Sequence, residues 1–285
     1  MLWFGILGKK WGAVSVDRPA ALRSGCPSRE VGRLPICWER EEQMNETIRA
    51  LRARKSTRAF EKRPIPPELK GIILEAAVQA PTAGCQQLYT ILDITDQAIK
   101  DALVDTCDHQ PFIATAPLVL VFCADCKKWR DAFACAGAEP RAPGAGDLLL
   151  AVDDALIAAQ NAVIAAESLG IGSCYIGDIM ENCEAQRALL KLPDYVFPAA
   201  LVVFGWPTES QKRRPKPERC PMAHIVHENA YRPMEGEELR DMLGYKAGEE
   251  GFEAWCRAFC KRKYNSDFSR EMTRSAAVYL KQFED

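Results

Sequence analysis

The sequence predicts a domain of mixed α and β structure with few strands and many helices, because helical and extended patterns alternate along it. Two continuous apolar runs, 117–124 (PLVLVFCA) and 198–205 (PAALVVFG), have the composition of buried strands. Between them, 147–169 has the pattern of a helix that is apolar nearly all round and stops at Gly170. A helix without a polar face belongs in a core or an interface, and so much apolar helix for so few strands suggests a dimer interface.

The segments before this long helix have local patterns that are typical of helices and strands. Residues 45–53 form an amphipathic helical pattern, and Pro66-Pro67-Glu68 opens a second helix, because proline suits a first helical turn. That helix is expected to end before Pro81. Residues 88–95 are expected to form a strand and residues 96–106 a short helix.

After Gly170 the pattern becomes shorter and more broken. A turn that contains Gly170 and Gly172 leads into an extended piece through Tyr175 and Ile176. The remaining expected elements are a short helix near 181–190, the strand at 198–205, a basic, proline-rich loop at 211–221 and a mostly helical, charged tail at 237–285.

Residues 1–43 differ from the rest of the chain. They contain three of the six tryptophans, scattered prolines and no sustained helical or strand period. We expect a weakly ordered N-terminal extension, with Met44 as the natural start. The alternative is an ordered arm that lies on a partner subunit.

Composition excludes several classes of protein. The chain has 285 residues, 27% charged residues and a net charge of -2, which excludes a disordered chain, a collagen, a disulfide miniprotein and a globally basic nucleic-acid binder. Charges interrupt the longest apolar stretches before the ~20 residues that a membrane span needs. The 12 cysteines have no repeating spacing and no signal-peptide pattern precedes them, so we expect reduced thiols and a cytoplasmic protein.

Two cationic segments could bind phosphate. Residues 54–58 (RKSTR) place three cations and two hydroxyls at a helix end, and the planar fork of arginine matches phosphate. Residues 212–219 (KRRPKPER) could meet the same phosphate from the other side. Taken alone, the first segment is better explained as a solvated helix end and the second as a solvated basic loop.

Two further segments combine small residues with sharp turns. In 80–87 (APTAGCQQ), small residues and amides would let a planar ligand approach the backbone, although alone it fits an ordinary turn into a strand. In 165–177 (AAESLGIGSCYIG), the glycines follow a helix rather than precede one, so this is not the dinucleotide-binding fingerprint. That fingerprint and a Walker A motif are absent from the whole sequence.

In this order the segments resemble the FMN-dependent nitroreductase family, closest to its NAD(P)H:flavin oxidoreductase (oxygen-insensitive nitroreductase) branch. The resemblance covers roughly residues 44–285, and residues 1–43 have no counterpart. The matching pieces are RKSTRAF, APTAG-QQ, HQPFIATAPLVLVFCAD, AAESLGIGSCYIG, FGWP with KPERCP, HENAYRP and RKYNSDFSREMTRS.

The resemblance implies an α+β fold whose central mixed or antiparallel sheet is surrounded by helices. It also implies an intertwined, obligate homodimer with two FMN sites at the subunit interface. Residues 44–285 would then form the FMN-binding domain, which includes the helical C-terminal tail at 237–285. No nucleic-acid, membrane or metal partner is implied.

The site residues follow from the same resemblance. The phosphate and ribityl chain would be held by Arg54, Lys55, Ser56 and Arg58, with Lys216 and Arg219 closing from the later loop. The family pattern there is Lys-Pro-Arg, whereas this chain has Lys216-Pro217-Glu218-Arg219, so the identity of the second cation is open.

The flavin ring has its own set of matched residues. Pro81, Thr82 and Ala83 would pass under the ring from the partner subunit, and Gln110 would bond the ring or the ribityl chain. Beside the reactive edge would run Tyr175, Ile176, Gly177 and Asp178, the last standing where the family often has a second glycine.

The implied activity is ping-pong electron transfer. NADH or NADPH would deliver hydride to N5 of the FMN, and a nitroaromatic, a quinone or free flavin would then accept the electrons. No catalytic nucleophile or essential side-chain acid is expected, because the flavin carries the chemistry. The alternative function is a flavin-binding storage or sensor protein without pyridine-nucleotide turnover.

Other patterns point to different chemistry. Cys123 and Cys126 have thioredoxin-type spacing, which makes a thiol oxidoreductase a third, weaker hypothesis. Cys220, His224 and His227 could be taken for a metal site, but the spacing of His224 and His227 suits neither the i, i+4 pattern of a helix face nor one strand face, so a polar segment is expected there instead. The run 127–130 (KKWR) is interpreted as a solvated face, and the loop 137–147, with three Gly and two Pro, could form an active-site lid.

Overall fold

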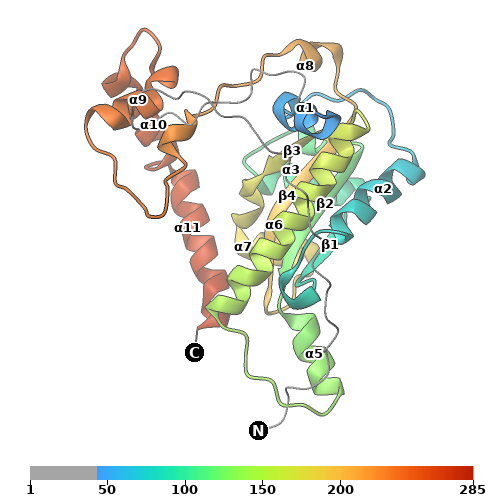
Figure 1. Ribbon diagram of the computed structural model, residues 1–285. Coiled ribbons are helices and arrows are strands. Elements are labelled where there is room, and N and C mark those ends of the chain that lie inside the picture. Colours follow the sequence, from blue (N-terminus) through green and yellow to red (C-terminus); the bar gives the residue numbers. More distant parts are fainter. Residues whose placement is uncertain (1–43, 285) are drawn as a thin grey trace, which may run out of the picture. The chain divides into compact units, whose positions relative to one another are not determined.

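A computed structural model describes residues 44–284 of the chain. The expected N-terminal extension, 1–43, lies outside the described residues. The described part contains one four-stranded antiparallel sheet in the order β1-β2-β4-β3, as Figure 1 shows. The strands are β1 (Tyr89–Asp93), β2 (Leu118–Asp125), β3 (Gly172–Ile176) and β4 (Val196–Gly205). The predicted α+β class and the antiparallel sheet are confirmed.

Both faces of this sheet are covered, which explains why its central strands are apolar without a break. In β2, the even-numbered side chains from Leu118 to Ala124 join one hydrophobic cluster, and the odd-numbered ones from Val119 to Cys123 join another. Strand side chains alternate between the two faces of a sheet. Every residue of β2 and β4 is therefore buried.

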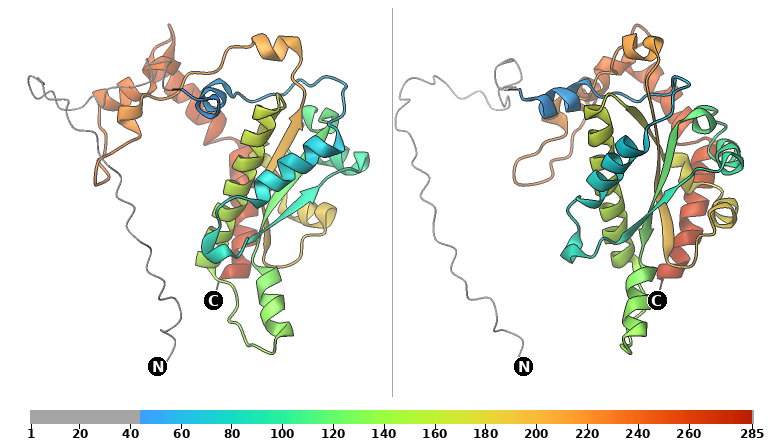
Figure 2. Two further views of the ribbon diagram at one scale, coloured as in Figure 1. Left: turned by 45° about the vertical axis from the view of Figure 1, so that its right-hand side comes forward. Right: turned by 90° about the vertical axis from the view of Figure 1, so that its right-hand side faces the viewer.

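Two layers of helices provide that cover. On one face α2 (Pro67–Val78) and α6 (Ala145–Ser168) contribute to the first cluster, and α6 packs against all four strands. On the other face lie α3 (Gln97–Thr106), α4 (Phe112–Thr115) and α7 (Cys183–Leu190). The right-hand view of Figure 2 shows the sheet between these two layers.

The helix α6 meets the length and composition of a membrane-crossing helix, with 24 residues and a mean hydropathy of 1.6. In this structure it is a core helix, because one side of it lies on the sheet and includes nine buried residues. Gly170 ends it in the left-handed conformation (φ 75°), and Ile171 N donates to Ala166 O at 2.8 Å. This is the helix stop that the sequence predicted.

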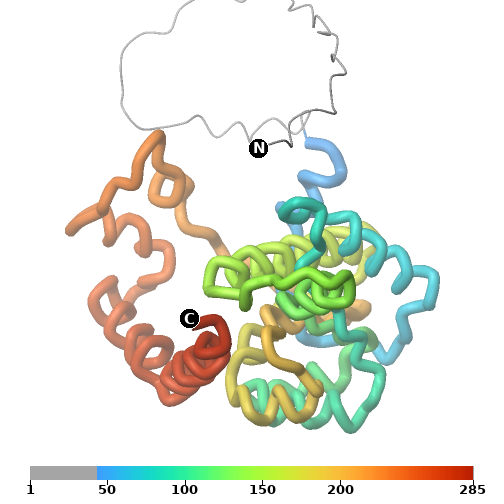
Figure 3. Tube along the Cα trace, turned by 90° about the horizontal axis from the view of Figure 1, so that it is seen from below, coloured from blue at the N-terminus to red at the C-terminus, as the bar shows by residue number. Residues whose placement is uncertain are grey.

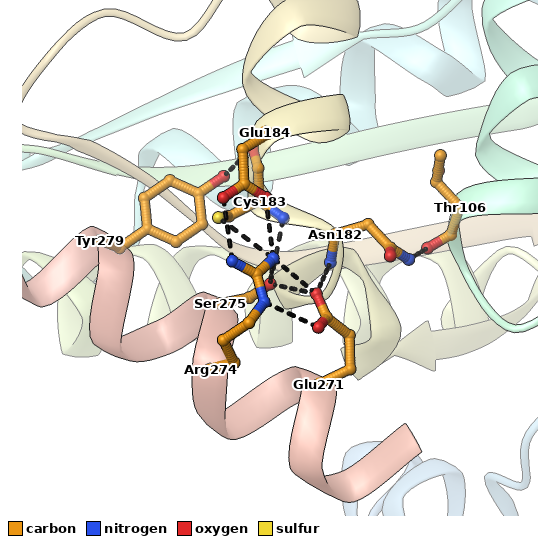
Figure 4. Close-up of polar contacts among 8 residues, drawn as sticks. All are labelled: Thr106, Asn182, Cys183, Glu184, Glu271, Arg274, Ser275 and Tyr279. Atoms are coloured by element: carbon orange, nitrogen blue, oxygen red, sulfur yellow. Dashed lines mark hydrogen bonds and ion pairs between the residues drawn. The ribbon is translucent and has the colours of Figure 1, made fainter. Parts of the chain in front are cut away.

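The C-terminal tail contains α9 (Glu237–Ala247), α10 (Phe252–Lys263) and α11 (Asp267–Leu280), and α11 packs beside α7 (Figure 3). Charged groups hold α11 in place. The Arg274 guanidinium donates to both carboxylate oxygens of Glu184 at 2.8 and 2.9 Å and to Glu271 at 2.8 Å (Figure 4). A ring contact between Phe197 and Tyr279 at 5.0 Å adds apolar packing.

The structure corrects the expected elements in three places. The basic loop expected over 211–221 begins inside a helix, α8 (Glu209–Arg213), because the Thr208 side chain caps it by accepting from Gln211 N at 3.3 Å. The short helix α4 was not predicted. Neither was α5 (Lys127–Cys135), which the Asp125 side chain caps by accepting from Lys127 N at 3.0 Å. The 127–130 run thus starts a helix.

Candidate functional site

The cationic segment after α1 (Glu46–Ala53) lies in extended form against the edge strand β3. Thr57 N donates to Ser173 O at 2.9 Å, and Ser56 forms a parallel bridge with Ser173. The approach is close, since a Cβ on Gly172 would overlap the Thr57 side chain. Glycine at 172 is therefore what allows Ser56 and its neighbours to reach the sheet.

A buried amide fixes the conformation of the same segment. Gln211, 5% exposed, donates through Nε2 to Ser56 O at 3.1 Å and accepts from Arg58 N at 3.3 Å. These two bonds hold the backbone on both sides of Thr57. The bonds to Gln211 use only backbone groups of Ser56 and Arg58, and leave their side chains out of the fixing of the segment.

Two lysines connect the segment to the later basic loop. The Lys55 ammonium donates to the carbonyls of Lys212, at 2.6 Å, and Arg214. The Lys216 ammonium donates to the last carbonyls of α1, those of Leu51 (3.3 Å) and Arg52. Backbone carbonyls satisfy these cations but do not neutralise them, so positive charge accumulates where the two segments meet.

The charge in this cluster is not balanced. Burial lowers the pKa of Lys216, and the nearby Arg219 and Arg54 cations lower it further, against the opposing effect of Glu167. The Arg54 Nε atom is buried and has no hydrogen-bond partner among the described residues. Glu167, at the C-terminal end of α6, has its own pKa raised by burial in spite of the surrounding cations. An anion with several oxygens would relieve both the repulsion and the unpaired donor, and phosphate has that chemistry.

Two more predicted cations lie at the same sheet edge. The Arg58 guanidinium stands 5.9 Å from the centre of the Phe112 ring and is close enough to lower the pKa of Cys174. Arg219 is exposed, donates to Pro217 O at 3.3 Å and lies close enough to Lys216 to affect its pKa.

Gln110 and the end of β3 come together beside this cluster. Gln110 Nε2 donates to Asp178 Oδ2 at 2.7 Å and to Cys107 O at 3.0 Å. The Tyr175 hydroxyl donates to Gln160 Oε1 at 3.3 Å. Ile176 is only 2% exposed and packs in the core, so it offers a ligand its backbone alone. Gly177 is exposed and starts the turn η4 (Gly177–Met180).

The turn at Pro81, Thr82 and Ala83 lies elsewhere in the chain. It is attached to the middle of α6 by Asp154, which accepts from the Thr82 hydroxyl, from Ala83 N at 3.1 Å and from Leu88 N at 3.0 Å. Asp154 and Glu167 are thirteen residues apart on one helix, which is about 20 Å along its axis. One chain therefore does not bring this turn to the cationic cluster.

A comparison with known families decides the class of the chain. The family model described as "Nitroreductase family" matches residues 51–206, which run from α1 to the end of β4. The chain belongs to the nitroreductase family. The predicted family is confirmed, and the chain is an oxidoreductase.

Individual nitroreductase-family proteins cover most of the chain. The oxygen-insensitive NADPH nitroreductase of Salmonella typhimurium is 38% identical over 192 residues, 67% of this chain and 77% of that protein. The FMN reductase (NAD(P)H) of Bacillus subtilis is 29% identical over 241 residues, 84% of this chain and 92% of that protein. The solved structure of the NADPH:FMN oxidoreductase from Vibrio harveyi complexed with NAD+ has a TM-score of 0.71 at 26% identity, covering 83% of this chain and 98% of that one.

Sequence reasoning missed three residues of this nitroreductase. Asp154 carries a visible signal, because Asp153-Asp154 interrupts an otherwise apolar helix, and a charge on the buried face needs partners. Gln211 and Glu181 carry no such signal. Glu181 is 5% exposed in the turn after Asp178, and burial together with the Asp178 carboxylate raises its pKa to about 8.

The competing patterns find little support in the described residues. Burial raises the pKa of both Cys123 and Cys126 to about 12, so neither thiol is a reactive thiolate at neutral pH. His224 bonds Asp241 at 2.8 Å and His227 accepts from Arg232 N. Among residues 44–284 no group of three or more His, Cys, Asp or Glu is arranged to hold a metal ion.

The possible lid, 137–147, lies away from the cationic cluster. Its last three residues belong to the first turn of α6, and Gly144 is close to Phe283 near the C-terminus. The cationic cluster surrounds the other end of α6, near Glu167. A lid role over the cluster of the same chain is therefore not supported by this arrangement.

Proposed function

We propose that this chain is an FMN-dependent oxidoreductase that takes electrons from NADH or NADPH and passes them to a nitroaromatic, a quinone or free flavin. The observation that carries the proposal is the uncompensated cationic cluster at the edge of β3, with its buried and unpaired Arg54 Nε. Family membership supports it. The nucleotides and the flavin named for the relatives fit the same reaction.

The residues at this edge fit the cofactor. The phosphate and ribityl chain would be held by Arg54, Lys55, Ser56, Arg58, Lys216 and Arg219. The ring would lie along the backbone of Tyr175, Ile176, Gly177 and Asp178, with Gln110 at its side. Bound FMN would supply the hydride chemistry. The cations at 54–58 and 216–219 would anchor the phosphate, and the exposed backbone at Gly177 would admit the reactive edge.

The proposal includes a homodimer, because the turn at 81–83 is too far from the cluster of its own chain. Apolar side chains on α1, α2 and α6 are exposed in the single chain. They are Leu51 (43%), Ile72 (50%), Val78 (48%), Leu149 (66%), Leu150 (49%), Leu156 (38%) and Ile157 (40%). Exposed apolar side chains gathered on one helix, as four of these are on α6, are typical of an interaction site. Pairing α6 with its copy would cover these side chains and bring Pro81, Thr82 and Ala83 of one protomer to the cluster of its partner. Residues 44–285 would form the FMN-binding domain, and the enzyme would work in the cytoplasm, where NADH and NADPH are supplied.

The deciding experiment is the visible absorption spectrum of the purified protein, followed by identification of any released chromophore. We expect a yellow protein that releases equimolar FMN and oxidises NADH or NADPH when a nitrofuran or a quinone is added. FMN without such turnover would favour the storage or sensor function. A protein that neither contains nor takes up FMN would overturn the proposal.

A further inference from the structure

Gln110 is held so that only its carbonyl oxygen faces outward. Its two amide hydrogens go to Cys107 O at 3.0 Å and Asp178 Oδ2 at 2.7 Å. A carbonyl and a carboxylate can only accept, so the NH₂ group must point toward them. No described residue donates to Gln110 Oε1. The preceding residues, Asp108 and His109, both have left-handed backbones (φ 56° and 51°), and strain of this kind is tolerated where a site requires it.

Asp178 is in turn paired with a second carboxyl group. Glu181 closes the turn by donating its N–H to Asp178 O at 3.0 Å, its side chain is 5% exposed, and its Oε1 is buried without a partner. The charged groups that face it are Asp178 in its own turn, Asp108 after α3 and Glu271 on α11. The thiol of Cys107 also lies close to both carboxyls.

Hydrogen bonds to the neighbouring elements hold the backbone next to Glu181. The next residue, Asn182, donates its N–H to Glu271 Oε1 at 3.1 Å and its Nδ2 to Thr106 O at 3.0 Å (Figure 4). The Glu271 carboxylate is itself occupied by Arg274 and Ser275. Glu181 thus has no cation among the described residues to balance it, and burial together with Asp178 raises its pKa to about 8.

We infer that Glu181 keeps its proton at neutral pH beside Asp178 and that the two side chains act together as a positioning pair that fixes Gln110 as a hydrogen-bond acceptor toward the flavin. This inference rests on the proposed function. The proton on Glu181 keeps the pair at a single negative charge, and Asp178 remains an acceptor for the Gln110 amide. Gln110 Oε1 would then receive a bond from a ring N–H or a ribityl hydroxyl of FMN. When Glu181 loses its proton, a second negative charge appears beside the site.

The proton on Glu181 can be tested without any flavin activity. The probe is the infrared band of a protonated carboxyl group in the full chain, and the variants are Glu181→Gln and, as a control, Glu249→Gln on the exposed tail. We expect a band at pH 7 that disappears as the pH passes about 8. It should be absent from Glu181→Gln and unchanged in Glu249→Gln. A wild-type chain without this band at pH 7 would overturn the inference.

Stability provides a second readout in the same proteins. The folded pKa of Glu181 is raised to about 8 from 4.5, so between these values the folded chain binds more protons than the unfolded chain. Its stability therefore declines as pH rises through this window. In thermal unfolding, the stability of Glu181→Gln should therefore decline less than that of wild type as pH rises from 4.5 to about 8. If the stabilities of wild type and Glu181→Gln depend on pH equally, the inference that Glu181 keeps its proton at neutral pH is overturned.

The link to the flavin is tested by FMN affinity between pH 6 and pH 9, measured by quenching of FMN fluorescence. Wild type should lose affinity above pH 8, while Glu181→Gln should show a flatter profile. Asp178→Ala removes the acceptor that orients Gln110 and should weaken FMN about tenfold at pH 7, with Asp178→Asn, whose carbonyl oxygen can still accept from Gln110, restoring part of it. Identical profiles for wild type and Glu181→Gln would overturn the role of the pair. If no variant binds FMN at any pH, the proposed function fails, whereas the infrared band still reports on the pair.

Discussion

Two regions of the chain were predicted to belong to one site, the turn at 81–83 and the cationic cluster around Arg54. They differ in whether their polar and charged groups find partners within the chain. The turn at 81–83 is complete within the chain, because Asp154 accepts from the Thr82 hydroxyl and from two backbone N–H groups. The cationic cluster around Arg54 is incomplete, because Arg54 Nε is a buried donor without a partner among the described residues. Burial and the neighbouring Arg219 and Arg54 cations also lower the pKa of Lys216. The polar groups of the turn at 81–83 are already paired, so within its own chain the turn serves as scaffold. The charge of the cationic cluster is unbalanced, and the cluster is therefore where we propose that the ligand binds.

The distance between the two regions adds a second lesson. They are attached to different parts of α6, about 20 Å apart along its axis. Neither can complete the other within one chain. In the proposed homodimer a copy of the chain would bring them together across the exposed apolar side chains, four of which lie on α6 itself.

The largest expected effect comes from breaking that pairing. Leu149, 66% exposed on α6, would be buried in the dimer, so Leu149→Asp would place a charge in an apolar interface. We expect a monomer that retains no FMN, measured by light scattering after size exclusion and by flavin content. The control is Ile225→Asp, since Ile225 is 67% exposed and lies outside the α6 face. A Leu149→Asp protein that stays dimeric and yellow would place the interface elsewhere.

Asp154 is expected to have the next largest effect, on stability. Asp154→Asn weakens three hydrogen bonds to a buried carboxylate and should lower the free energy of unfolding by about 3 kcal/mol, measured by urea denaturation. The matched control is its exposed neighbour, in Asp153→Asn, which should stay within about 0.5 kcal/mol of wild type. Equal small losses in both variants would show that the turn does not depend on Asp154.

Arg54 and Arg58 should show the opposite pattern, with an effect on the ligand and little on the fold. Each alanine substitution should raise the dissociation constant for FMN by about 10- to 100-fold, because a charge-assisted bond contributes ~1.5–3 kcal/mol. Unfolding of the FMN-free chain should be unchanged or slightly harder, since one repelling cation is removed. Arg49→Ala, an exposed change on α1, serves as control. Unchanged FMN affinity in both variants would mean that the phosphate binds elsewhere.

The sequence was sufficient for most of the framework, whereas the residues that it assigned to the site stay predictions. Strands β2 and β4 were recognised because burial on both faces leaves an unbroken apolar run, and Gly170 marked the end of α6. The helix α5 was missed because its cap, Asp125, is the last residue of the buried strand β2 and the basic run after it suggested only a solvated surface. Gln211 and Glu181 were missed because their roles arise from contacts with residues that are distant in sequence, such as Ser56, or from burial that no local pattern records.

The smallest effect is expected where charges are numerous but already paired within the chain. Arg274 lies between Glu184 and Glu271, and its guanidinium holds the pKa of each carboxyl at about 2, below the usual 4.5. This stabilisation is present above pH 4.5 and is lost as pH falls toward 2. Arg274→Gln should lower the melting temperature slightly at pH 7, and the difference from wild type should vanish near pH 2. High salt should reduce the difference in melting temperature as well, because exposed ion pairs are screened.

The control is Arg270→Gln on the same helix, because the contact of Arg270 with Asp267 at 3.5 Å is exposed and local. A difference in melting temperature that persists at pH 2 would show that Arg274 holds α11 by packing and not by its ion pairs. The paired charges at Arg274 would then not explain why this region needs no ligand.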